Sequence, residues 1–539
     1  MQSKAGSGRG YSLLLFGTAL FAVGWAVARA ALQSITLDEA DTYLFWAAPS
    51  GYVFWPSSNN HILNSLLMRF STVAFGLSPL TVRLPALLGG VLYVSAALYL
   101  CRHITARAVL QWSLFVCLVF NPFVFDFLVA ARGFSMALGF LAWALALPAA
   151  ALQRETATER ALLRAAAISS ICGGLAFAAN FSFAFGIAGL LLMSFLWMRL
   201  RLPRGAAGSA RLLGSCMLPG ALAAAILCAR TVLQFPKSQL FYGTRSLVES
   251  LKSMIGPTLY ELNPHLMSAR LYAVVAPRRN LLLPLLGAAV VCQLVAMFRS
   301  RRELSDGAAR WHLQFGTVLA GGSALALLAH WIGFHAFGLL MPKDRTGLYL
   351  VLSATLITGL LAALRAPSKM GGMCQKTLEI MLLVMAFYFL GCLRLSYFRE
   401  WKYDADVSQA YPVAAGYARE LGARDVPSHW FYTTSLTFYR KLDQNGTIDA
   451  FPRIGDDTAA ERNRREAYPA GQPVYVLYYP EDRGFLEREG LRVVYHGKLS
   501  DIVVAVKPGP GIPEAAGPEP MRDPVFWDRY RRSLAELQP

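Results

Sequence analysis

Long apolar runs constrain the fold of this chain more than any other feature of its sequence. A helix needs about 20 apolar residues to cross the hydrocarbon core of a bilayer, which is about 30 Å thick. The 539-residue chain is 55% hydrophobic and 16% charged, which argues against a soluble multidomain enzyme. We therefore expect a mainly α-helical, polytopic membrane protein with about eleven transmembrane helices. The predicted spans are 11–31, 82–101, 108–125, 130–152, 161–179, 181–198, 212–232, 281–298, 312–334, 346–364 and 377–395.

Two junctions between these spans leave alternatives open. The runs on either side of Pro122 lie close together, and so do the runs on either side of Asn180. Each pair can be read as two spans, as one merged span or as a re-entrant segment.

The formal net charge of +18 belongs to the apolar part of the chain. Residues 396–539 contain 19 basic and 21 acidic residues, so the positive excess lies before them. A nucleic-acid-binding protein would instead carry a basic face on a soluble domain. Positive loops between membrane spans are typical of polytopic proteins. We therefore predict a lipid bilayer as the environment and no nucleic-acid partner.

The loops between the spans indicate an orientation. Alternate loops are rich in Lys and Arg, and the loops around 121–130 and 180 are nearly free of both. The positive-inside rule then places the N-terminus in the cytoplasm and the outer loops 33–81, 233–280 and 335–345 on the other side, with an odd number of spans. The first span lacks a clear cleavage site, so we favour a retained anchor over a signal peptide. The composition suggests the inner membrane of a bacterium.

The sequence pattern changes after the last span. Residues 1–395 are expected to form the membrane domain, 396–510 a small periplasmic α/β domain, and 511–539 a tail. Helical and strand-like segments alternate in the α/β domain, which is typical of a three-layer unit. We interpret it as a lid or an acceptor platform without catalytic residues. The predicted segments are helices at 406–422, 435–442 and 485–489 and strands at 474–479, 491–496 and 502–506.

Acidic residues are scarce before Ser396, and three of them gather directly after the first span. Asp38, Glu39 and Asp41 lie within four consecutive positions at the predicted outer membrane surface. Carboxylates beside apolar segments are costly and often functional. The alternative is a simple polar loop in which Asp38 caps a helix.

The segment after this acidic motif carries two further motifs. Asn59-Asn60-His61 precedes an amphipathic stretch at 62–69 that we expect to lie along the membrane interface. Arg83-Leu84-Pro85 then opens the second span. The order is a span, an acidic pair, a histidine motif, a surface helix and an Arg-Leu-Pro span.

This order resembles the GT-C superfamily of integral-membrane glycosyltransferases. It is most similar to the group of protein mannosyltransferases, aminoarabinose transferases and Rgt-like galacturonosyltransferases. The resemblance rests on Asp38-Glu39, His61 and Arg83-Leu84-Pro85, and it covers residues 11–200 well and the later spans by topology. The usual His-Pro-Pro is replaced here by Asn-Asn-His. The segment Ala131-Arg132-Gly133-Phe134 is similar to the family's Glu-Ala-Arg-Met-Tyr motif, of which only Arg132 carries over.

The resemblance implies an enzyme that transfers a hexose or pentose from a polyprenyl-phosphate-linked donor on the outer side of the membrane. An acceptor hydroxyl must lose a proton as it attacks the anomeric carbon, and a carboxylate can take that proton. Asp38 is our first choice as general base, and Glu39 is the alternative. We expect His61, Asn60, Asp41, Asp126 and Arg83 to position the donor or the acceptor.

The lipid phosphate that leaves in this reaction requires cations at the level of the headgroups. Arg132, Lys343 and Arg345 are the candidates, because a guanidinium binds phosphate in a bidentate manner. Lys343 and Arg345 are also suited to interfacial anchoring. Asp126 is either a second carboxylate of the site or a partner of Arg132. The family sometimes binds a divalent cation, for which Asp38, Asp126 and Glu39 are the candidate ligands, and no other cofactor is predicted.

Two other function classes remain as alternatives. A transporter or flippase of lipid-linked glycans usually shows repeated halves and ionisable groups in mid-membrane, and neither is evident. A non-catalytic scaffold would leave the acidic pair and the Lys343–Arg345 loop unexplained. The sequence does not specify the sugar, the polyprenyl carrier or the acceptor, which is a glycan, a lipid or a protein.

Overall fold

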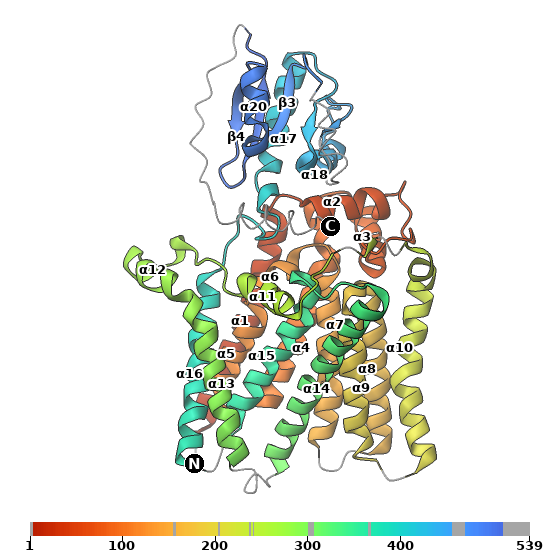
Figure 1. The fold of residues 1–539 in the computed structure, drawn as a ribbon, viewed down its shortest axis with the longest axis vertical. Coiled ribbons are helices and arrows are strands. Elements are labelled where there is room, and N and C mark those ends of the chain that lie inside the picture. Colours follow the sequence, from red (N-terminus) through yellow and green to blue (C-terminus); the bar gives the residue numbers. More distant parts are fainter. Residues whose placement is uncertain are drawn as a thin grey trace. The chain divides into compact units, whose positions relative to one another are not determined.

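The computed structural model describes residues 4–154, 158–202, 205–236, 239–240, 242–299, 307–364, 368–454 and 469–509. The chain forms two compact units, whose helices and strands are drawn in Figure 1. The first comprises residues 1–30, 52–74 and 82–394, and the second comprises residues 31–51, 75–81 and 395–539. Part of the first predicted outer loop therefore belongs to the same unit as the C-terminal segment. The predicted tail at 511–539 lies outside the described residues.

The first unit is built from long apolar helices (Figure 1). Within the described ranges, ten helices are long and apolar enough to cross a membrane, and the number rises to eleven if one bent pair of helices counts as a single span. The chain is therefore an integral membrane protein, and the mainly α-helical fold class is confirmed. The ten are α1 (Lys4–Leu32), α4 (Pro79–Ile104), α7 (Phe134–Gln153), α8 (Glu159–Ala179), α9 (Ala184–Arg199), α10 (Ala206–Gln234), α13 (Leu282–Arg299), α14 (Gly307–Phe337), α15 (Leu348–Ala363) and α16 (Lys369–Gly391).

The two open junctions have different structures. Helices α5 (Ala108–Val119) and α6 (Pro122–Val129) form the bent pair, with an angle of 58° between them. Pro122 has no N–H to continue the helix, and Asn121 starts α6 by accepting a hydrogen bond from the N–H of Phe123 at 3.0 Å. At Asn180, by contrast, α8 ends and the short turn η2 (Phe181–Phe183) leads into α9, so two separate spans meet there.

Small residues allow neighbouring spans to approach closely. A Cβ at Gly174 on α8 would lie 2.3 Å from the carbonyl oxygen of Gly220 on α10. A Cβ at Gly189 on α9 would likewise lie 2.3 Å from the carbonyl oxygen of Gly322 on α14. Helices in lipid associate largely through such close packing, because lipid tails are as apolar as the side chains.

Shorter helices join the spans of the first unit. Helix α3 (Ile62–Phe75) covers the predicted surface helix and extends beyond it, but its 14 residues are too few to cross a bilayer. The long loop after α10 and the loop before α15 contain five more short elements. These are α11 (Leu247–Thr258), η4 (Pro264–Leu266), α12 (Ala269–Val275), η5 (Ala276–Leu281) and η6 (Asp344–Gly347).

The second unit contains a five-stranded mixed sheet in the order β2-β1-β3-β5-β4. Strand β1 runs parallel to β2 and β3, and β5 runs antiparallel to β3 and β4. The strands are β1 (Ser428–His429), β2 (Arg453–Ile454), β3 (Val474–Tyr478), β4 (Arg492–His496) and β5 (Ile502–Val506). The helical elements are α2 (Leu37–Asp41), η1 (Thr42–Ala47), η7 (Lys402–Asp404), α17 (Val407–Glu420), α18 (Trp430–Leu442) and α20 (Tyr479–Arg488).

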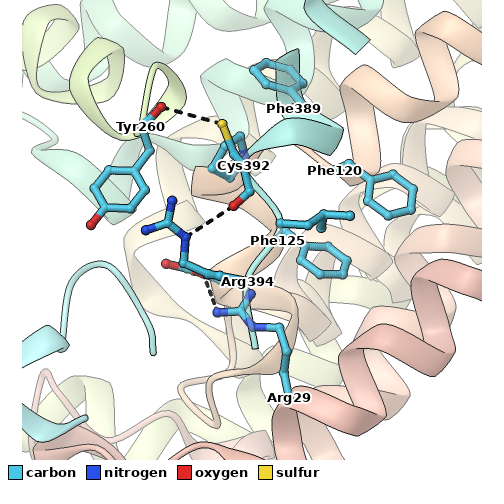
Figure 2. A pocket seen from close by; sticks show the side chains of 10 residues that line it. Arg29, Phe120, Phe125, Tyr260, Phe389, Cys392 and Arg394 are labelled. Atoms are coloured by element: carbon cyan, nitrogen blue, oxygen red, sulfur yellow. Dashed lines mark hydrogen bonds and ion pairs between the residues drawn. The ribbon is translucent and has the colours of Figure 1, made fainter. Parts of the chain in front are cut away.

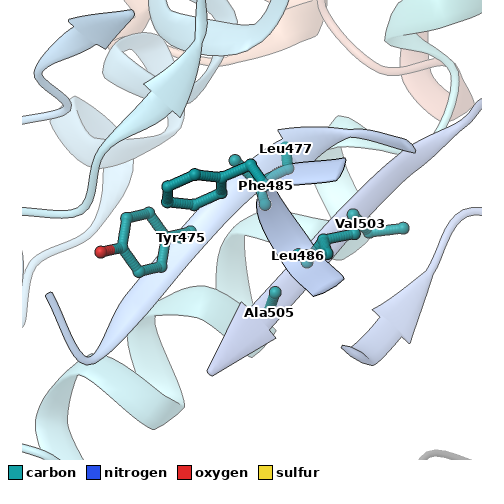
Figure 3. Close-up of a cluster of buried hydrophobic side chains, with 6 residues drawn as sticks. All are labelled: Tyr475, Leu477, Phe485, Leu486, Val503 and Ala505. Carbon is teal, nitrogen blue, oxygen red and sulfur yellow. The ribbon is translucent and has the colours of Figure 1, made fainter. Parts of the chain in front are cut away.

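A compact apolar core joins this sheet to α20 (Figure 3). Tyr475 and Leu477 on β3 and Val503 and Ala505 on β5 point to one face, because side chains alternate along a strand. Phe485 of α20 packs against them, together with Leu486. Helix α17 also contacts β3 and β5, whose residues are all buried.

The predicted strands at 474–479, 491–496 and 502–506 correspond to β3, β4 and β5. The pattern did not indicate β1 and β2, because two residues each are too few to show an alternation. Helix α18 begins at Trp430, before the predicted start at Ser435, because His429 serves as its N-cap. Helix α20 begins at Tyr479, before the predicted start at Phe485.

Candidate active site

The acidic motif forms helix α2 in the second unit. The side chain of Thr36 accepts a hydrogen bond from the N–H of Glu39 at 3.2 Å, and Glu39 Oε2 accepts one from the N–H of Thr36 at 3.0 Å. This reciprocal capping box fixes the start of the helix. Glu39 is 0% exposed, whereas Asp38 and Asp41 are half-buried. Asp38 therefore presents the more accessible carboxylate.

Two residues of the C-terminal segment contact this helix. The indole N–H of Trp401 donates to Asp38 Oδ2 at 3.2 Å, and the N–H of Leu37 donates to Asp404 Oδ2 at 2.7 Å. Asp404 is buried, and burial raises the pKa of its carboxyl group well above the usual value. Hydrogen bonds from Leu37 and Ser435 oppose this shift, and the negative charges of Asp38 and Glu39 add to it.

In the first unit, Arg132 lies in a buried turn between α6 and α7. The guanidinium of Arg132 donates to Asn59 Oδ1. The turn itself is held by amide side chains, because Asn64 donates to the carbonyl oxygen of Ala131 at 3.0 Å. Gly133 has a φ of +73°, and a Cβ there would lie 2.1 Å from the carbonyl oxygen of Ala179. Only glycine fits this position, because a side chain would meet that oxygen and is strained at a positive φ.

His61 lies beside this turn, against the ring of Phe134, with 5.9 Å between the ring centroids. Burial lowers the pKa of His61 well below its usual value, and the positive charges of Arg132 and Arg345 lower it further. The imidazole is therefore neutral at neutral pH. Among the described residues, its buried Nδ1 has no hydrogen-bond partner. A Cβ at Gly133, next to Arg132, would lie 3.3 Å from the Cβ of His61, and η6, which carries Arg345, contacts η2 just after Ala179. We call Arg132, His61 and Arg345 the cationic cluster.

Arg345 is held by the loop that follows α10. Its guanidinium lies over the ring of Tyr242, 4.7 Å from the ring centroid, and the Tyr242 hydroxyl donates to Asp344 Oδ2 at 3.2 Å. Asp344 has a φ of +44°, a strained value for a residue with a side chain. The N–H of Asp344 donates to Ser253 Oγ of α11 at 2.8 Å, which helps to hold this conformation. Lys343 is half-buried in the same loop.

Asn60 and Arg83, two of the predicted positioning residues, donate hydrogen bonds to backbone carbonyl oxygens. The side-chain amide of Asn60 donates to the carbonyl oxygens of Val53 and Trp55 at 2.7 and 3.0 Å. Arg83 is buried and donates to the carbonyl oxygen of Ala30 near the end of α1 at 3.0 Å. These contacts place both residues in the frame around the site, and their part in positioning a substrate stays a prediction.

Asp126 forms an ion pair with Arg29, with 2.6 Å between Oδ1 and Nη2. The pair lines a small cavity of about 20 Å³, which Figure 2 shows together with Arg394 and Tyr260. The Arg394 guanidinium lies 4.3 Å from the centroid of the Tyr260 ring. Arg29 lies within the first span. It was not predicted as the partner of Asp126, for which Arg132 was the candidate.

An apolar groove of about 250 Å³ runs between helices of the first unit. Helices α5, α11, α13, α15 and α16 contribute its walls. Apolar side chains provide most of the lining, which includes Leu286, Val351 and Met385. Phe389 lines both this groove and the cavity beside Arg29.

The described residues do not supply a metal-binding set. Within the ranges that the structure describes, no group of three or more His, Cys, Asp or Glu side chains is placed to hold a metal ion. Of the residues predicted for such a role, Asp38 and Glu39 belong to the second unit and Asp126 belongs to the first.

Comparison with solved structures identifies the fold. The aminoarabinose transferase ArnT from Cupriavidus metallidurans, in its apo state, superimposes with a TM-score of 0.52. The match has 14% sequence identity and covers 93% of this chain and 100% of ArnT. The chain has the GT-C fold.

Two further solved structures are similar to the chain at lower TM-scores. The same ArnT bound to undecaprenyl phosphate gives a TM-score of 0.48 at 14% identity, covering 93% of this chain and 99% of ArnT. The oligosaccharyltransferase from Archaeoglobus fulgidus, in complex with Zn and sulfate, gives 0.42 at 12% identity, covering 87% of this chain and 69% of the transferase. No protein-family model matches the chain, and no curated protein does so either.

Within this GT-C fold, the structure brings Arg132, His61 and Arg345 together in the first unit and places Asp38, Glu39 and Asp41 in the second. Four residues that contact these side chains or the helix that carries them were not predicted from the sequence. Asn59 and Tyr242 had a signal, since they lie in the Asn-Asn-His motif and in an outer loop. Trp401 and Asp404 had none, because they lie more than 360 positions from α2.

Proposed function

We propose that the protein is a glycosyltransferase that moves a sugar from a polyprenyl-phosphate-linked donor to an acceptor on the outer face of the membrane. The observation that carries this proposal is the cationic cluster: Arg132 and Arg345 share the surroundings of a neutral, buried His61 in a membrane protein of GT-C fold. The expected location is the inner membrane of a bacterium, with the C-terminal domain in the periplasm.

The cationic cluster suits a lipid phosphate. Arg132 is buried and Arg345 is supported by Tyr242, so neither guanidinium has to be ordered when a ligand binds. Guanidinium groups bind phosphate oxygens in a bidentate manner, and the attraction is stronger away from bulk water. Lys343, two positions before Arg345, adds a cation at the same loop. The open Nδ1 of His61 is available to hydrogen-bond the sugar or the phosphate.

The apolar groove supports a lipid-linked donor. A polyprenyl chain requires a path within the membrane that is lined by apolar side chains. The groove between α11, α13 and α15 provides about 250 Å³ of such space, and α11 also carries Ser253, which holds Asp344. We propose that the chain of the donor lies there.

Asp38 is the general base of the proposed reaction. In the transfer step, the acceptor oxygen bonds to the anomeric carbon while its proton passes to the Asp38 carboxylate. The bond between the anomeric carbon and the phosphate oxygen breaks, and the phosphate leaves with the electron pair. The positive charges of Arg132 and Arg345 stabilise that leaving group. Glu39 is the weaker candidate, because its Oε2 serves the capping box and its side chain is buried.

A divalent cation has no step in this mechanism. The described residues offer no cluster of metal ligands, and Asp126 is already paired with Arg29. We expect sugar transfer by membranes to persist in EDTA. A loss of transfer that Mg²⁺ or Mn²⁺ restores would contradict this expectation.

A deletion strain tests the proposal. Mass spectrometry of its envelope glycans and lipids should show the loss of one sugar, restored by the wild-type chain. That comparison would also identify the sugar and the acceptor, whether glycan, lipid or protein. Purified protein should bind undecaprenyl phosphate, as measured by native mass spectrometry. An unchanged envelope with accumulation of a lipid-linked sugar on the cytoplasmic side would instead indicate a flippase.

A further inference from the structure

We propose that Trp401 and Asp404, which lead into the C-terminal domain, are positioning residues for the carboxylate of Asp38 during sugar transfer. The inference rests on the proposed function, in which Asp38 is the base. It gives the C-terminal segment a part in catalysis beyond that of a lid or a platform.

Direct contacts connect both residues to the acidic helix. Trp401 donates its indole N–H to one carboxylate oxygen of Asp38 at 3.2 Å. Asp404 accepts the N–H of Leu37, the residue before Asp38, at 2.7 Å. The first contact sets the rotation of the Asp38 carboxylate, and the second sets the position of the backbone that carries it. All of these residues belong to the second unit.

Further hydrogen bonds tie the residues before Asp38 to the same segment. Ser34 donates its hydroxyl to the carbonyl oxygen of Ala405 at 2.8 Å, and the N–H of Ile35 donates to the hydroxyl of Tyr439 on α18 at 3.0 Å. Ser435 of α18 donates to the second oxygen of Asp404 at 3.1 Å. The approach to α2 is therefore held at successive positions by residues that lie far away in the sequence.

A helix as short as α2 requires such support. It has five residues, and isolated helices below about 12 residues are marginal in water. The capping box satisfies the N–H groups of Thr36 and Glu39, and Asp404 satisfies that of Leu37. Trp401 is 2% exposed and Asp404 is 1% exposed, so both are fixed by their own packing. Rigid neighbours of this kind are what a catalytic group needs to keep its geometry.

Asp404 is placed to accept hydrogen bonds, and its surroundings disfavour a negative charge on its carboxyl group. Burial, followed by the charges of Asp38 and Glu39, raises its pKa well above the usual value. Asp404 holds the backbone of α2 through the N–H of Leu37. An asparagine at this position keeps the size and one acceptor oxygen, whereas an alanine keeps neither.

The experiment compares variants of the full chain in the deletion strain. Asp404→Ala and Trp401→Phe each remove one contact, and Asp404→Asn is the conservative variant. Asp406→Ala is the matched control: Asp406 is equally buried, but its Oδ2 accepts the N–H groups of Leu499 and Ser500 at 2.7 Å, away from α2. Sugar on the envelope acceptor is measured soon after induction and normalised to the inserted protein. Binding of undecaprenyl phosphate to each purified variant is measured separately.

We expect Asp404→Ala and Trp401→Phe to lower transfer about 10- to 100-fold, because small displacements of a catalytic group cost that much. Asp404→Asn should restore most of the rate. All three should bind undecaprenyl phosphate as the wild type does, and Asp406→Ala should transfer at a near-wild-type rate. Hydrogen–deuterium exchange of a peptide covering residues 31–45 should accelerate in Asp404→Ala and Trp401→Phe and stay unchanged in Asp406→Ala.

The possible failures are distinguishable. Wild-type transfer by Asp404→Ala and Trp401→Phe, with an inactive Asp38→Asn, would overturn the positioning role and leave the proposed function standing. Wild-type transfer by Asp38→Asn would overturn the choice of base. If Asp404→Ala lost lipid binding and transfer to the same extent, the residue would be needed for folding alone, which would also overturn the proposal. Should Asp404→Ala fail to insert, the comparison of Trp401→Phe with Asp404→Asn still decides it.

Discussion

The acidic helix α2 and the cationic cluster hold their charged groups in different ways. Asp38 depends on partners that follow it by more than 360 residues, in a segment beyond the last span. Arg132, His61 and Arg345 are held by short turns and loops between spans, through Asn59, Gly133 and Tyr242. The acid is therefore placed by packing against the segment that follows the last span, and the cations by contacts between loops of the first unit, such as that of Arg132 with Asn59, 73 positions away. The proposed base and the proposed phosphate-binding residues are therefore held by different parts of the chain.

A second contrast lies within the first unit, between two buried arginines. Arg29 is held by the carboxylate of Asp126 at 2.6 Å, and the guanidinium of Arg132 donates to the amide of Asn59. An ion pair cancels charge, whereas an amide orients a guanidinium and preserves its charge. The contrast fits the proposed binding role of Arg132, and it predicts a structural role for Arg29.

The largest effect should come from the base itself. Asp38→Asn keeps the size of the side chain and removes the proton acceptor, so transfer should fall about 10²- to 10⁴-fold. Transfer is measured as sugar on the envelope acceptor in the deletion strain. Glu487→Gln, in an exposed ion pair with Arg483, is the control and should transfer normally. A fully active Asp38→Asn protein that inserts normally would break the assignment of α2 to chemistry.

Asp126 should behave differently from Asp38. Asp126→Asn leaves Arg29 buried without its counter-charge, which typically costs about 3–5 kcal/mol of unfolding free energy. Thermal unfolding in detergent should therefore shift strongly to lower temperature. The double variant Arg29→Met, Asp126→Leu should recover much of that stability, because it removes both buried charges. A stable Asp126→Asn protein with no activity would place this carboxylate in the reaction instead.

Substitutions in the cationic cluster should weaken the binding of the lipid phosphate. Arg132→Gln and Arg345→Gln each remove a charged donor, and a hydrogen bond to a charged group contributes about 1.5–3 kcal/mol. We expect undecaprenyl phosphate to bind roughly 10- to 100-fold more weakly to each variant. Arg310→Gln, in the first turn of α14 on the predicted cytoplasmic side, should bind as the wild type does. Equal binding by all three variants would mean that the lipid phosphate lies elsewhere.

The smallest expected effect is a pH dependence of stability. Burial and the charges of Arg132 and Arg345 lower the pKa of His61, so the unfolded chain binds a proton more readily than the folded one below about pH 6.5. Stability should therefore decrease as the pH falls below that value, by at most about 1.4 kcal/mol per pH unit. The His61→Gln variant should lose this part of the slope. Thermal unfolding between pH 7.5 and 5.5 measures it, and identical slopes would contradict a buried, neutral His61.

Much of the membrane unit was predictable because apolar runs of fixed length have few alternative structures in lipid. The predicted spans correspond to the observed helices, and the main difference lies at Pro122, where hydropathy cannot distinguish a bend from a boundary. The motif that contains Asp38 was noticeable because acidic residues are few before Ser396. The chain's resemblance to the GT-C superfamily agrees with the fold that the structure shows.

The partners of the charged residues were not predictable in the same way. The Arg29–Asp126 pair joins residues 97 positions apart, and no periodicity connects them. Asp404 looks like any acid in a polar segment, since its burial arises only when η7 packs beside α2 and α18. The two-residue strands β1 and β2 exist because the longer β3 pairs with β1 and orders this edge of the sheet. Long-range packing determines these features, and a single sequence does not report it.

The dependence of α2 on the C-terminal segment also has a consequence for biosynthesis. Residues 31–51 leave the ribosome early, but their partners at 401–439 are made only after the last span. At about 5–20 residues per second, synthesis of the intervening chain takes on the order of tens of seconds. The loop that carries the proposed base must wait in an incomplete state throughout that time. With Asp38 as the proposed base, we expect competence only after residues 401–439 have been made, so a product that stops after the last span should transfer no sugar.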